Sequence, residues 1–349
     1  MGGEQGYNQT IFIVTERLVM DRFVTYLAEK FIDTTYSSLR GLFTPNPFRR
    51  PDPSAWWLTA CPEDFFAIPE APPQLNQTIF RLGALGTLSR FTFPSSYQSP
   101  HPQNNTVHGV ADLRPSGDAR AALIFVHGHK MASFLPLELF ARRVIRNEFD
   151  VYYLALPYHM RRAPKGAWSG QHSLNADIEG TAMAFMQGVR DVRALISWIE
   201  QERGIPVALA GVSLGAFTCN MVSVVDPRPK AVVSLLGGGS LAQIHWDGYQ
   251  MGQIRRQLQT GGVTFEQLEQ YWSLLSPQNW QSRLPREKLL LVGGQYDPIV
   301  TPDNVRKLWR AWKEPQLLWF PCGHVTASLY YRSIGQAMQT FLQQALKPS

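Results

Sequence analysis

Residues 206–220 read PVALAGVSLGAFTCN, and this stretch decides the fold. The apolar run before Gly211 predicts a buried strand, and the apolar segment after Ser213 predicts a helix. A strand-to-helix turn this tight brings neighbouring backbone so close that glycine is needed on both sides, at Gly211 and Gly215. We therefore expect Ser213 to project its hydroxyl from the end of the strand. The alternative is an ordinary serine beside two glycines, and the flanking strand and helix argue against it.

Apolar runs alternate with helical patterns on both sides of this turn. The runs that suit strands buried on both faces are AALIFVHG (121–128), DVYYLALP (150–157), PVALAGVS (206–213), KAVVSLLGGG (230–239), KLLLVGGQYD (288–297) and QLLWFPCGH (316–324). Two alternating segments, RFTFPSSY (90–97) and TVHGVADLRP (106–115), precede them as an antiparallel pair. This order predicts an α/β fold with a doubly wound, mostly parallel sheet of eight strands.

The N-terminal quarter has a different character, so we divide the chain into an extension at 1–86 and a main domain at 87–349. Apolar residues at helical spacing over 11–43 predict one long or two shorter amphipathic helices packed on the body. A membrane-surface face or a homodimer face is the alternative for these helices. Dense proline over 45–73 predicts an extended arm, and its aromatic residues indicate that the arm lies against the globule.

A serine hydroxyl needs a base that takes its proton, and the base needs an acid that orients it. Asp297 and His324 each follow a predicted strand. Because the carboxyl ends of parallel strands meet at one edge of a sheet, we expect both beside the serine. Three rivals have simpler explanations: Asp303 begins a helix, His245 lies in an insertion as a surface or lining residue, and His127 precedes a turn glycine.

The segment VHGHK at 126–130 is a candidate oxyanion hole. The tetrahedral intermediate of acyl transfer needs two preorganised N–H donors. One is expected from Leu214, the residue after the serine, and the other from the loop that Gly128 allows to turn. We assign the second donor to His129, with Lys130 as the alternative. The competing interpretation is a plain turn glycine with histidines that face solvent.

The motifs HGH, GVSLG, GGQYDPIVTPD and FPCGH, in this order, resemble the α/β-hydrolase superfamily over about residues 88–345. LPYHMRRAPKGAWSG, GVSLGAFT and WFPCGHVT together are similar to a bacterial branch related to the abhydrolase domain-containing protein eighteen group. The resemblance implies a cofactor-free serine hydrolase with Ser213 as nucleophile, Asp297 as acid and His324 as base. The long N-terminal extension departs from simpler members and puts substrate access and oligomeric state in question.

Two segments are expected to choose the substrate. The basic loop at 157–173 contains His159, Arg161 and Arg162, which could recognise a carboxylate or phosphate. These arginines could equally pair with surface acids and pin the loop. An insertion at about 240–284 carries two helical patterns and aromatic residues such as Trp246. It is predicted to form a lid with an apolar acyl pocket, or else a capping subdomain with its own small core.

Composition excludes several classes of function. The net charge of +6 is spread along the chain without a basic run, which argues against a nucleic-acid partner. Three scattered cysteines and an N-terminal apolar run of only 11–14 favour a reducing, cytoplasmic location, and no stretch is long enough for a membrane span. No metal site is predicted, because His127 and His129 have no third ligand near them in sequence. The segment GGGS at 237–240 lacks the lysine and spacing of a phosphate-binding loop.

These features together predict a serine esterase. An acyl-enzyme on Ser213 would cleave a carboxylic ester or thioester of a small molecule, with an anionic group on the substrate as a further expectation. A peptidase, amidase or acyltransferase would use the same residues, because the acyl-enzyme is common to all of them. A non-catalytic scaffold that keeps the fold is the third alternative.

Overall fold

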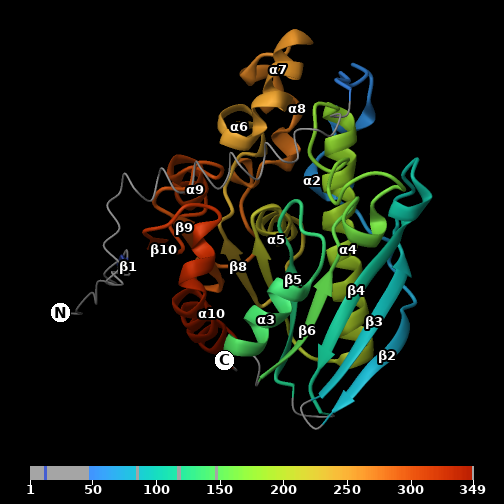
Figure 1. Ribbon diagram of the computed structural model, residues 1–349, viewed down its shortest axis with the longest axis vertical. Coiled ribbons are helices and arrows are strands. Elements are labelled where there is room, and N and C mark those ends of the chain that lie inside the picture. The colour runs from blue at the N-terminus through green and yellow to red at the C-terminus, as the bar shows by residue number, and fades with distance from the viewer. Residues whose placement is uncertain (1–11, 14–46, 84–85, 116–118, 146–147, 348–349) are drawn as a thin grey trace, which may run out of the picture.

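The computed structural model describes residues 12–13, 47–83, 86–115, 119–145 and 148–347. Within them one sheet of ten strands runs through the molecule in the order β1-β10-β9-β8-β7-β5-β6-β4-β3-β2 (Figure 1). The strands are β1 (Phe12–Ile13), β2 (Asn76–Gly83), β3 (Gly86–Pro94), β4 (Thr106–Leu113), β5 (Ala121–Val126), β6 (Phe149–Leu154), β7 (Val207–Val212), β8 (Ala231–Leu235), β9 (Leu289–Gly294) and β10 (Gln316–Phe320).

All pairings from β1 across to β6 are parallel, and those of β6, β4, β3 and β2 are antiparallel. The predicted fold class is therefore confirmed, but the sheet has ten strands instead of the expected eight. The additional strands are β1 and β2, both in the segment assigned to the extension. β2 lies at the sheet edge with its described side chains exposed, so it has no buried face to mark it in the sequence.

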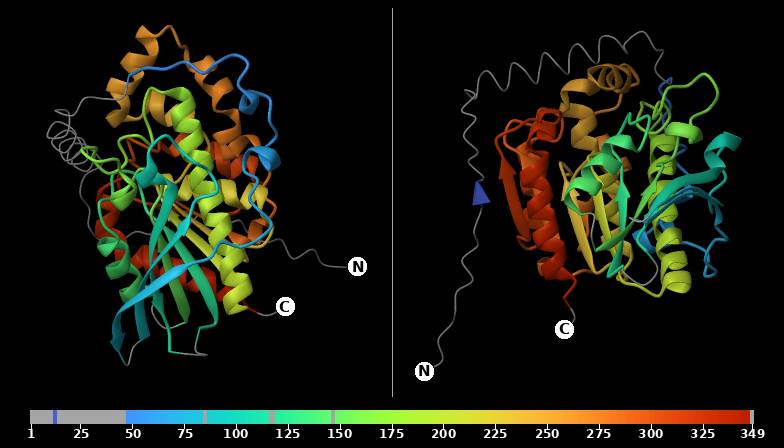
Figure 2. Two further views of the ribbon diagram at one scale, coloured as in Figure 1. Left: turned by 90° about the vertical axis from the view of Figure 1, so that its right-hand side faces the viewer. Right: turned by 60° about the horizontal axis from the view of Figure 1, so that its bottom comes forward.

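Helices cover both faces of the sheet (Figure 2). They are α2 (Pro62–Phe65), α3 (Leu135–Val144), α4 (Ile178–Arg203), α5 (Leu214–Val225), α6 (Leu241–Asp247), α7 (Gly252–Thr260), α8 (Phe265–Tyr271), α9 (Pro302–Ala311) and α10 (Tyr331–Ala345). One apolar layer joins Ile124 and Leu209 to α4 and α5, and the other joins Phe125 and Ala210 to α3 and α10. Adjacent strand residues thus face opposite buried layers, which explains the uninterrupted apolar runs.

The proline-rich arm lies against the globule. Its described part forms two short helical turns, Trp56–Leu58 and α2, and buries Trp57, Phe65 and Phe66. Arg190 of α4 donates two hydrogen bonds to the carbonyl oxygen of Phe65. Of the helices predicted over 11–43, only Phe12–Ile13 are described, and these form a strand; the rest lies outside the described residues. The division into an extension and a main domain stays a prediction.

A helical insertion connects β8 to β9. It contains α6, α7 and α8 and stands above the carboxyl ends of the central strands (Figure 1). Ser240 caps α6 by accepting the N–H of Gln243, and Thr264 begins α8 with a capping box. Among the described residues, no helix combines the length and apolarity needed to traverse a bilayer. The position of the insertion makes it a helical layer over the edge of the sheet near which Ser213, Asp297 and His324 lie.

Candidate active site

Ser213 sits on the predicted sharp turn between β7 and α5. Its backbone has φ 54 and ψ −118, a left-handed conformation that a side chain rarely adopts. A Cβ atom at Gly211 would lie 2.2 Å from the carbonyl oxygen of Gly215, and one at Gly215 would lie 2.2 Å from that of Val126. Both glycines are required by close backbone contacts, so the turn holds the serine in a strained and defined position.

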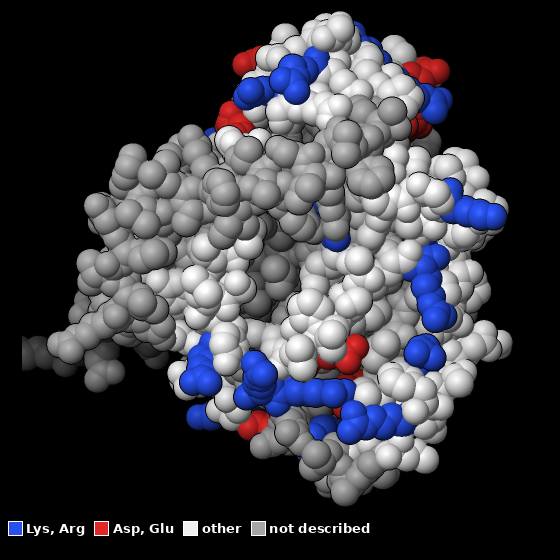
Figure 3. Space-filling model, viewed as in Figure 1, with Lys and Arg blue, Asp and Glu red and all other residues white. Residues whose placement is uncertain are grey.

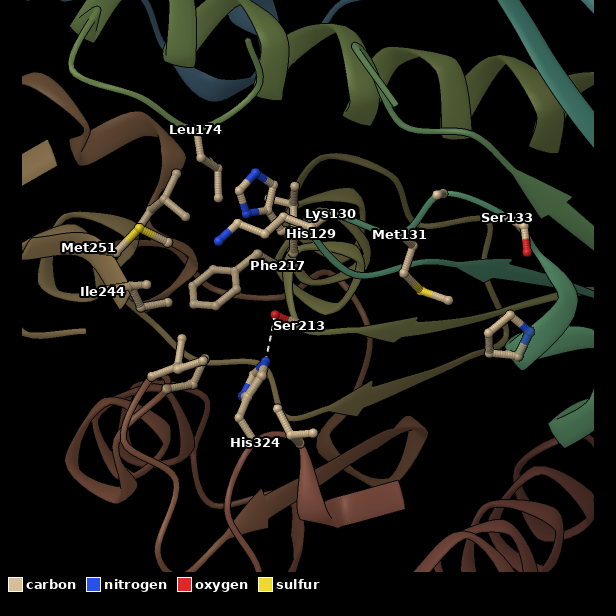
Figure 4. Close-up of a pocket in the computed structure, with 17 residues that line it drawn as sticks. His129, Lys130, Met131, Ser133, Leu174, Ser213, Phe217, Ile244, Met251 and His324 are labelled. Atoms are coloured by element: carbon tan, nitrogen blue, oxygen red, sulfur yellow. Dashed lines mark hydrogen bonds between the residues drawn. The ribbon is translucent and has the colours of Figure 1, made fainter. Parts of the chain in front are cut away.

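The structure brings together the three residues that the sequence singled out. Nε2 of His324 lies 2.9 Å from the Ser213 hydroxyl oxygen, and Nδ1 lies 2.6 Å from Oδ2 of Asp297 (Figure 4 shows the serine contact). The other carboxylate oxygen of Asp297 accepts the backbone N–H groups of Ile299 and Val300. Asp297 is also buried. The hydrogen bonds to its two oxygens hold the carboxylate in one orientation.

This arrangement defines where protons lie. A carboxylate can only accept, so Nδ1 of His324 carries the proton that Asp297 accepts. Nε2 then has an unshared electron pair, which accepts the hydroxyl proton of Ser213. The hydroxyl oxygen is therefore positioned to lose a proton to the imidazole while it attacks an electrophilic carbon.

Leu214 and His129 both line the pocket at Ser213, and their backbone N–H groups are the candidate oxyanion donors. Leu214 is the first residue of α5, so its N–H has no acceptor within the helix. Within the described part of the chain, the N–H of His129 has no hydrogen-bond acceptor, whereas that of Lys130 donates to Nε2 of His159 over 3.3 Å. A Cβ atom at Gly128 would lie 3.4 Å from Cβ of Ser213, so the glycine loop packs directly against the turn.

A cluster of three histidines shapes this loop, with His127 and His159 buried and His129 partly buried. The ring centroids of His127 and His159 are 4.8 Å apart, and those of His129 and His159 are 5.6 Å apart. Burial lowers the pKa of His127 to about 4 and that of His129 to about 3, and it holds the pKa of His159 well below its usual value. All three are therefore neutral near pH 7.

Each neutral ring of this cluster ties down backbone. His127 accepts the N–H of Leu156 at Nε2, and His129 donates from Nε2 to the carbonyl of Gly170. His159 donates from Nδ1 to the carbonyl of Pro157 and accepts the N–H of Lys130. The sequence assigned His159 to substrate binding, but its ring is fully buried and occupied with backbone. We therefore correct that assignment: His159 positions the loop.

The predicted anion-binding arginines are also placed differently from expectation. Arg162 is fully buried, and its guanidinium contacts Asp191 at 2.8 Å and donates to the carbonyls of Asn104 and Ala155. It is an internal cross-link and is unavailable to a substrate. Arg161 is exposed and does not line the pocket beside Ser213. The alternative role for Arg162, an ion pair that pins the loop, is thus the one that fits, but its partner Asp191 is buried and not a surface acid.

A pocket of about 410 Å³ opens at Ser213 and His324 and forms part of the hollow seen in Figure 3. The insertion supplies apolar wall residues, Leu241, Ile244 and Met251, and Phe217 of α5 lies beside Ile244 and Met251 (Figure 4). Trp246, which the sequence assigned to substrate contact, instead packs on Phe265 and lies outside the pocket lining. The pocket is therefore apolar, but with other insertion residues than expected.

Sequence reasoning missed Lys130 as a lining residue. Figure 4 shows its side chain extending into the pocket, and its ammonium lies 5.8 Å from the Trp168 ring. The backbone of Lys130 has φ 65, and this left-handed turn directs the side chain inward. A basic residue directly after HGH was the available signal for a side chain that lines the pocket.

The rival residues have structural roles. Asp303 lies in the first turn of α9 and pairs with Lys307 at 3.2 Å. His245 is fully buried against Trp272, neither at the surface nor in the pocket lining, and burial lowers its pKa to about 4. No group of three or more His, Cys, Asp or Glu in the described ranges could hold a metal ion.

A sequence model of the family described as "Alpha/beta hydrolase domain containing 18" matches residues 130–258. An acetyl xylan esterase from Paenibacillus sp. R4 is similar in structure, with a TM-score of 0.57 and 14% identity over 78% of this chain and 91% of the esterase. The chain has the α/β-hydrolase fold, and its central part matches this family model. The sequence motifs resembled the α/β-hydrolase superfamily and the abhydrolase domain-containing protein eighteen group, and this resemblance is thereby confirmed.

Two further similar proteins are a curated relative and a solved structure. An uncharacterized protein of Mycobacterium tuberculosis strain H37Rv is 28% identical over 311 residues, which cover 83% of this chain and 71% of the relative. A puromycin-hydrolyzing peptidase from Mycobacterium tuberculosis has a TM-score of 0.51 and 17% identity over 79% of this chain and 40% of the peptidase. Esterases and peptidases therefore share this fold, which leaves the cleaved bond open.

Proposed function

We propose that this α/β-hydrolase is a serine hydrolase that cleaves a carboxylic ester or thioester through an acyl-enzyme on Ser213. The observation that carries the proposal is the continuous chain of hydrogen bonds from Ser213 through His324 to Asp297. The strained turn and the buried carboxylate supply what such chemistry needs: a hydroxyl that lines the pocket, a base within reach and an acid that orients the base.

The proposed reaction has two halves. Ser213 Oγ attacks the carbonyl carbon while His324 Nε2 takes the hydroxyl proton, and the charge that develops on the carbonyl oxygen is held by the N–H groups of Leu214 and His129. His324 then gives its proton to the leaving oxygen or sulfur, and the acyl group remains on the serine. Water repeats the sequence, with His324 as base, and releases the carboxylic acid.

His129 is favoured over Lys130 as the second oxyanion donor. The N–H of Lys130 already donates to His159, whereas among the described residues the N–H of His129 has no acceptor. The hydrogen bonds of the histidine cluster to the backbone fix the loop, so the donor is preorganised before substrate arrives. His159 and Gly128 are positioning residues in this proposal, and neither contacts the substrate.

The pocket favours an ester with an apolar acyl part over a peptide. Its walls are mostly aliphatic, while recognition of an extended peptide relies on rows of backbone hydrogen-bonding groups. The insertion that carries Leu241, Ile244 and Met251 would act as a lid that excludes water from this pocket. A cytoplasmic location and a homodimer through residues 1–86 stay predictions.

The proposal is tested with matched esters and amides. We expect the purified protein to hydrolyse nitrophenyl butyrate, with Ser213→Ala lowering kcat on the order of a millionfold, and to hydrolyse the corresponding anilide much more slowly. Equal rates for the wild type and Ser213→Ala would refute the mechanism. Faster cleavage of the anilide than of the ester would favour the peptidase or amidase alternative.

A further inference from the structure

A second apolar pocket, of about 360 Å³, lies beside the pocket at Ser213. It lies between α3 and the turn Thr326–Tyr330 that leads into α10, and it reaches down to the ends of β8 and β9. Met131, Pro136, His324 and Val325 line both pockets. The two pockets are therefore adjacent, and His324 stands between them.

The inner wall of the second pocket is hydrophobic. Phe125, Leu236 and Ile334 are buried and form part of its floor, while Leu139 is 45% exposed at its rim. An open apolar hollow of this size lacks contact partners on one side, and it suits a hydrocarbon chain better than a polar group. The shape and chemistry of the pocket thus favour an aliphatic segment of a ligand.

The outer end of this pocket is basic. Arg143 of α3 and Tyr331 of α10 line it, and the guanidinium carbon of Arg143 lies 5.7 Å from the Tyr331 ring centroid. Arg143 and Tyr331 also line a neighbouring polar hollow, which Arg332 lines with them. Arg332 lies at the same distance from the Tyr331 ring and donates from Nε to its phenol oxygen over 2.9 Å. Figure 3 shows Lys and Arg side chains gathered on the surface over α3 and α10.

These two arginines differ from their neighbour in their partners. Arg142 pairs with Asp112 at 3.1 Å and Glu138 at 4.0 Å. In the part of the chain that the structure describes, Arg143 and Arg332 have no carboxylate partner. The hydrogen bond from Arg332 and the charges of both arginines lower the pKa of Tyr331, which is the expected effect of a local positive potential.

We propose that the second pocket binds the leaving-group arm of the substrate, an aliphatic chain that ends in an anionic group held by Arg143 and Arg332. This inference rests on the proposed function and names the substrate class: an ester of an alcohol with an anionic tail. His324 protonates the leaving oxygen, so the leaving group lies on the His324 side of the serine, where the second pocket begins. Arginine matches a carboxylate or phosphate with paired N–H donors.

The experiment compares butyrate esters of straight-chain alcohols that end in a carboxylate with esters of equal length that end in a primary amide. The chain length is varied, and butyrate release gives kcat/KM for each ester. We expect one chain length at which the carboxylate ester is hydrolysed about tenfold faster than the amide ester. The preference should shrink as salt is raised, because the arginines are exposed.

Variants identify the groups responsible. Arg143→Gln and Arg332→Gln should each reduce the carboxylate-to-amide ratio about threefold or more, and the double variant should bring the ratio to about one. Arg161→Gln, an exposed arginine outside both pocket linings, is the control and should keep the ratio. Ser328→Trp places a large side chain at an exposed lining position and should lower kcat/KM for long alcohol chains at least tenfold relative to ethyl butyrate.

The outcomes are separable. If the wild type hydrolyses neutral esters but shows no carboxylate preference at any length, the second-pocket proposal is wrong and the proposed function stands. Loss of the preference in Arg161→Gln, or a preference that follows a carboxylate on the acyl side, would also overturn it. If no ester is hydrolysed, the proposed function fails and this inference fails with it.

Discussion

Replacement of Arg162 separates a structural role from a substrate-binding role, because its sequence neighbour Arg161 provides a matched control. Arg162 and Asp191 are both buried, and the arginine also donates to the carbonyls of Asn104 and Ala155. Arg162→Ala leaves a buried carboxylate and two carbonyl groups without this partner. Removal of one member of a buried ion pair costs about 3–5 kcal/mol, whereas Arg161→Ala at the surface should change stability by less than about 0.5 kcal/mol.

The expected shift in melting temperature follows from chain length. An unfolding entropy of about 2.1 cal/mol/K per residue gives roughly 0.7 kcal/mol/K for 349 residues, so Arg162→Ala should lower Tm by about 4–7 °C. Burial already raises the pKa of Asp191, and loss of Arg162 should raise that pKa further. A carboxyl whose pKa is raised on folding loses stability as pH rises, so the deficit should be smaller near pH 4 than at pH 7.

Differential scanning calorimetry of both variants at the two pH values tests this reasoning, with ester kinetics in parallel. We expect Arg162→Ala to lose stability while the ester selectivity of its folded fraction is unchanged. An unchanged Tm together with a raised KM for anionic esters would refute the reasoning. It would restore Arg162 to the substrate-binding site that the sequence suggested.

Three further predictions concern the turn, the acid and the buried histidines. Gly211→Ala should lower the free energy of unfolding in urea by about 3 kcal/mol or more, because the added carbon would lie 2.2 Å from the Gly215 carbonyl oxygen. The control is Gly252→Ala, which should be neutral or slightly stabilising, because Gly252 has φ −57 and open space around it. Similar losses of stability in both variants would contradict this. In Asp297→Asn the side-chain oxygen can still accept the backbone N–H groups of Ile299 and Val300, but the amide favours the His324 tautomer that is protonated at Nε2, so kcat should fall about 10⁴-fold with Tm nearly retained. A fall below tenfold would argue against an orienting role for Asp297. His127 and His245 have pKa values of about 4, below the unfolded value of 6.5, so Tm should fall as pH drops from about 6.5 towards 4. Proton NMR should show that neither ring titrates between pH 5 and 8. Titration of either ring near pH 6.5 would contradict the claim that both are buried in the neutral form.

The central part of the fold and the three aligned residues were predictable because their signals are local. Gly211, Ser213 and Gly215 lie within five residues at a junction of strand and helix. Asp297 and His324 come three and four residues after the ends of β9 and β10. Residues that follow parallel strands lie at the same edge of the sheet, because the carboxyl ends of the strands meet there. Short-range pattern and topology therefore sufficed to bring the three together.

The substrate-binding residues were not predictable in the same way, because their environments depend on distant segments. Arg162 and Arg161 look alike in sequence, and only contacts with Asn104 and Asp191, which lie far along the chain, distinguish the buried one. Trp246 lies outside the pocket lining and packs on Phe265, a contact within the insertion that the sequence pattern does not reveal. Strand β2 was missed because an edge strand with exposed side chains has no alternation of burial to detect.

The most direct test of the central claim is to identify the residue that a fluorophosphonate probe labels. Intact mass and peptide mapping of the wild type should give one adduct on Ser213, and Ser213→Ala should give none. His324→Ala should label far more slowly, because the hydroxyl would lack its base. A wild type that stays unlabelled, or an adduct that persists in Ser213→Ala, would contradict the assignment of Ser213 as the nucleophile.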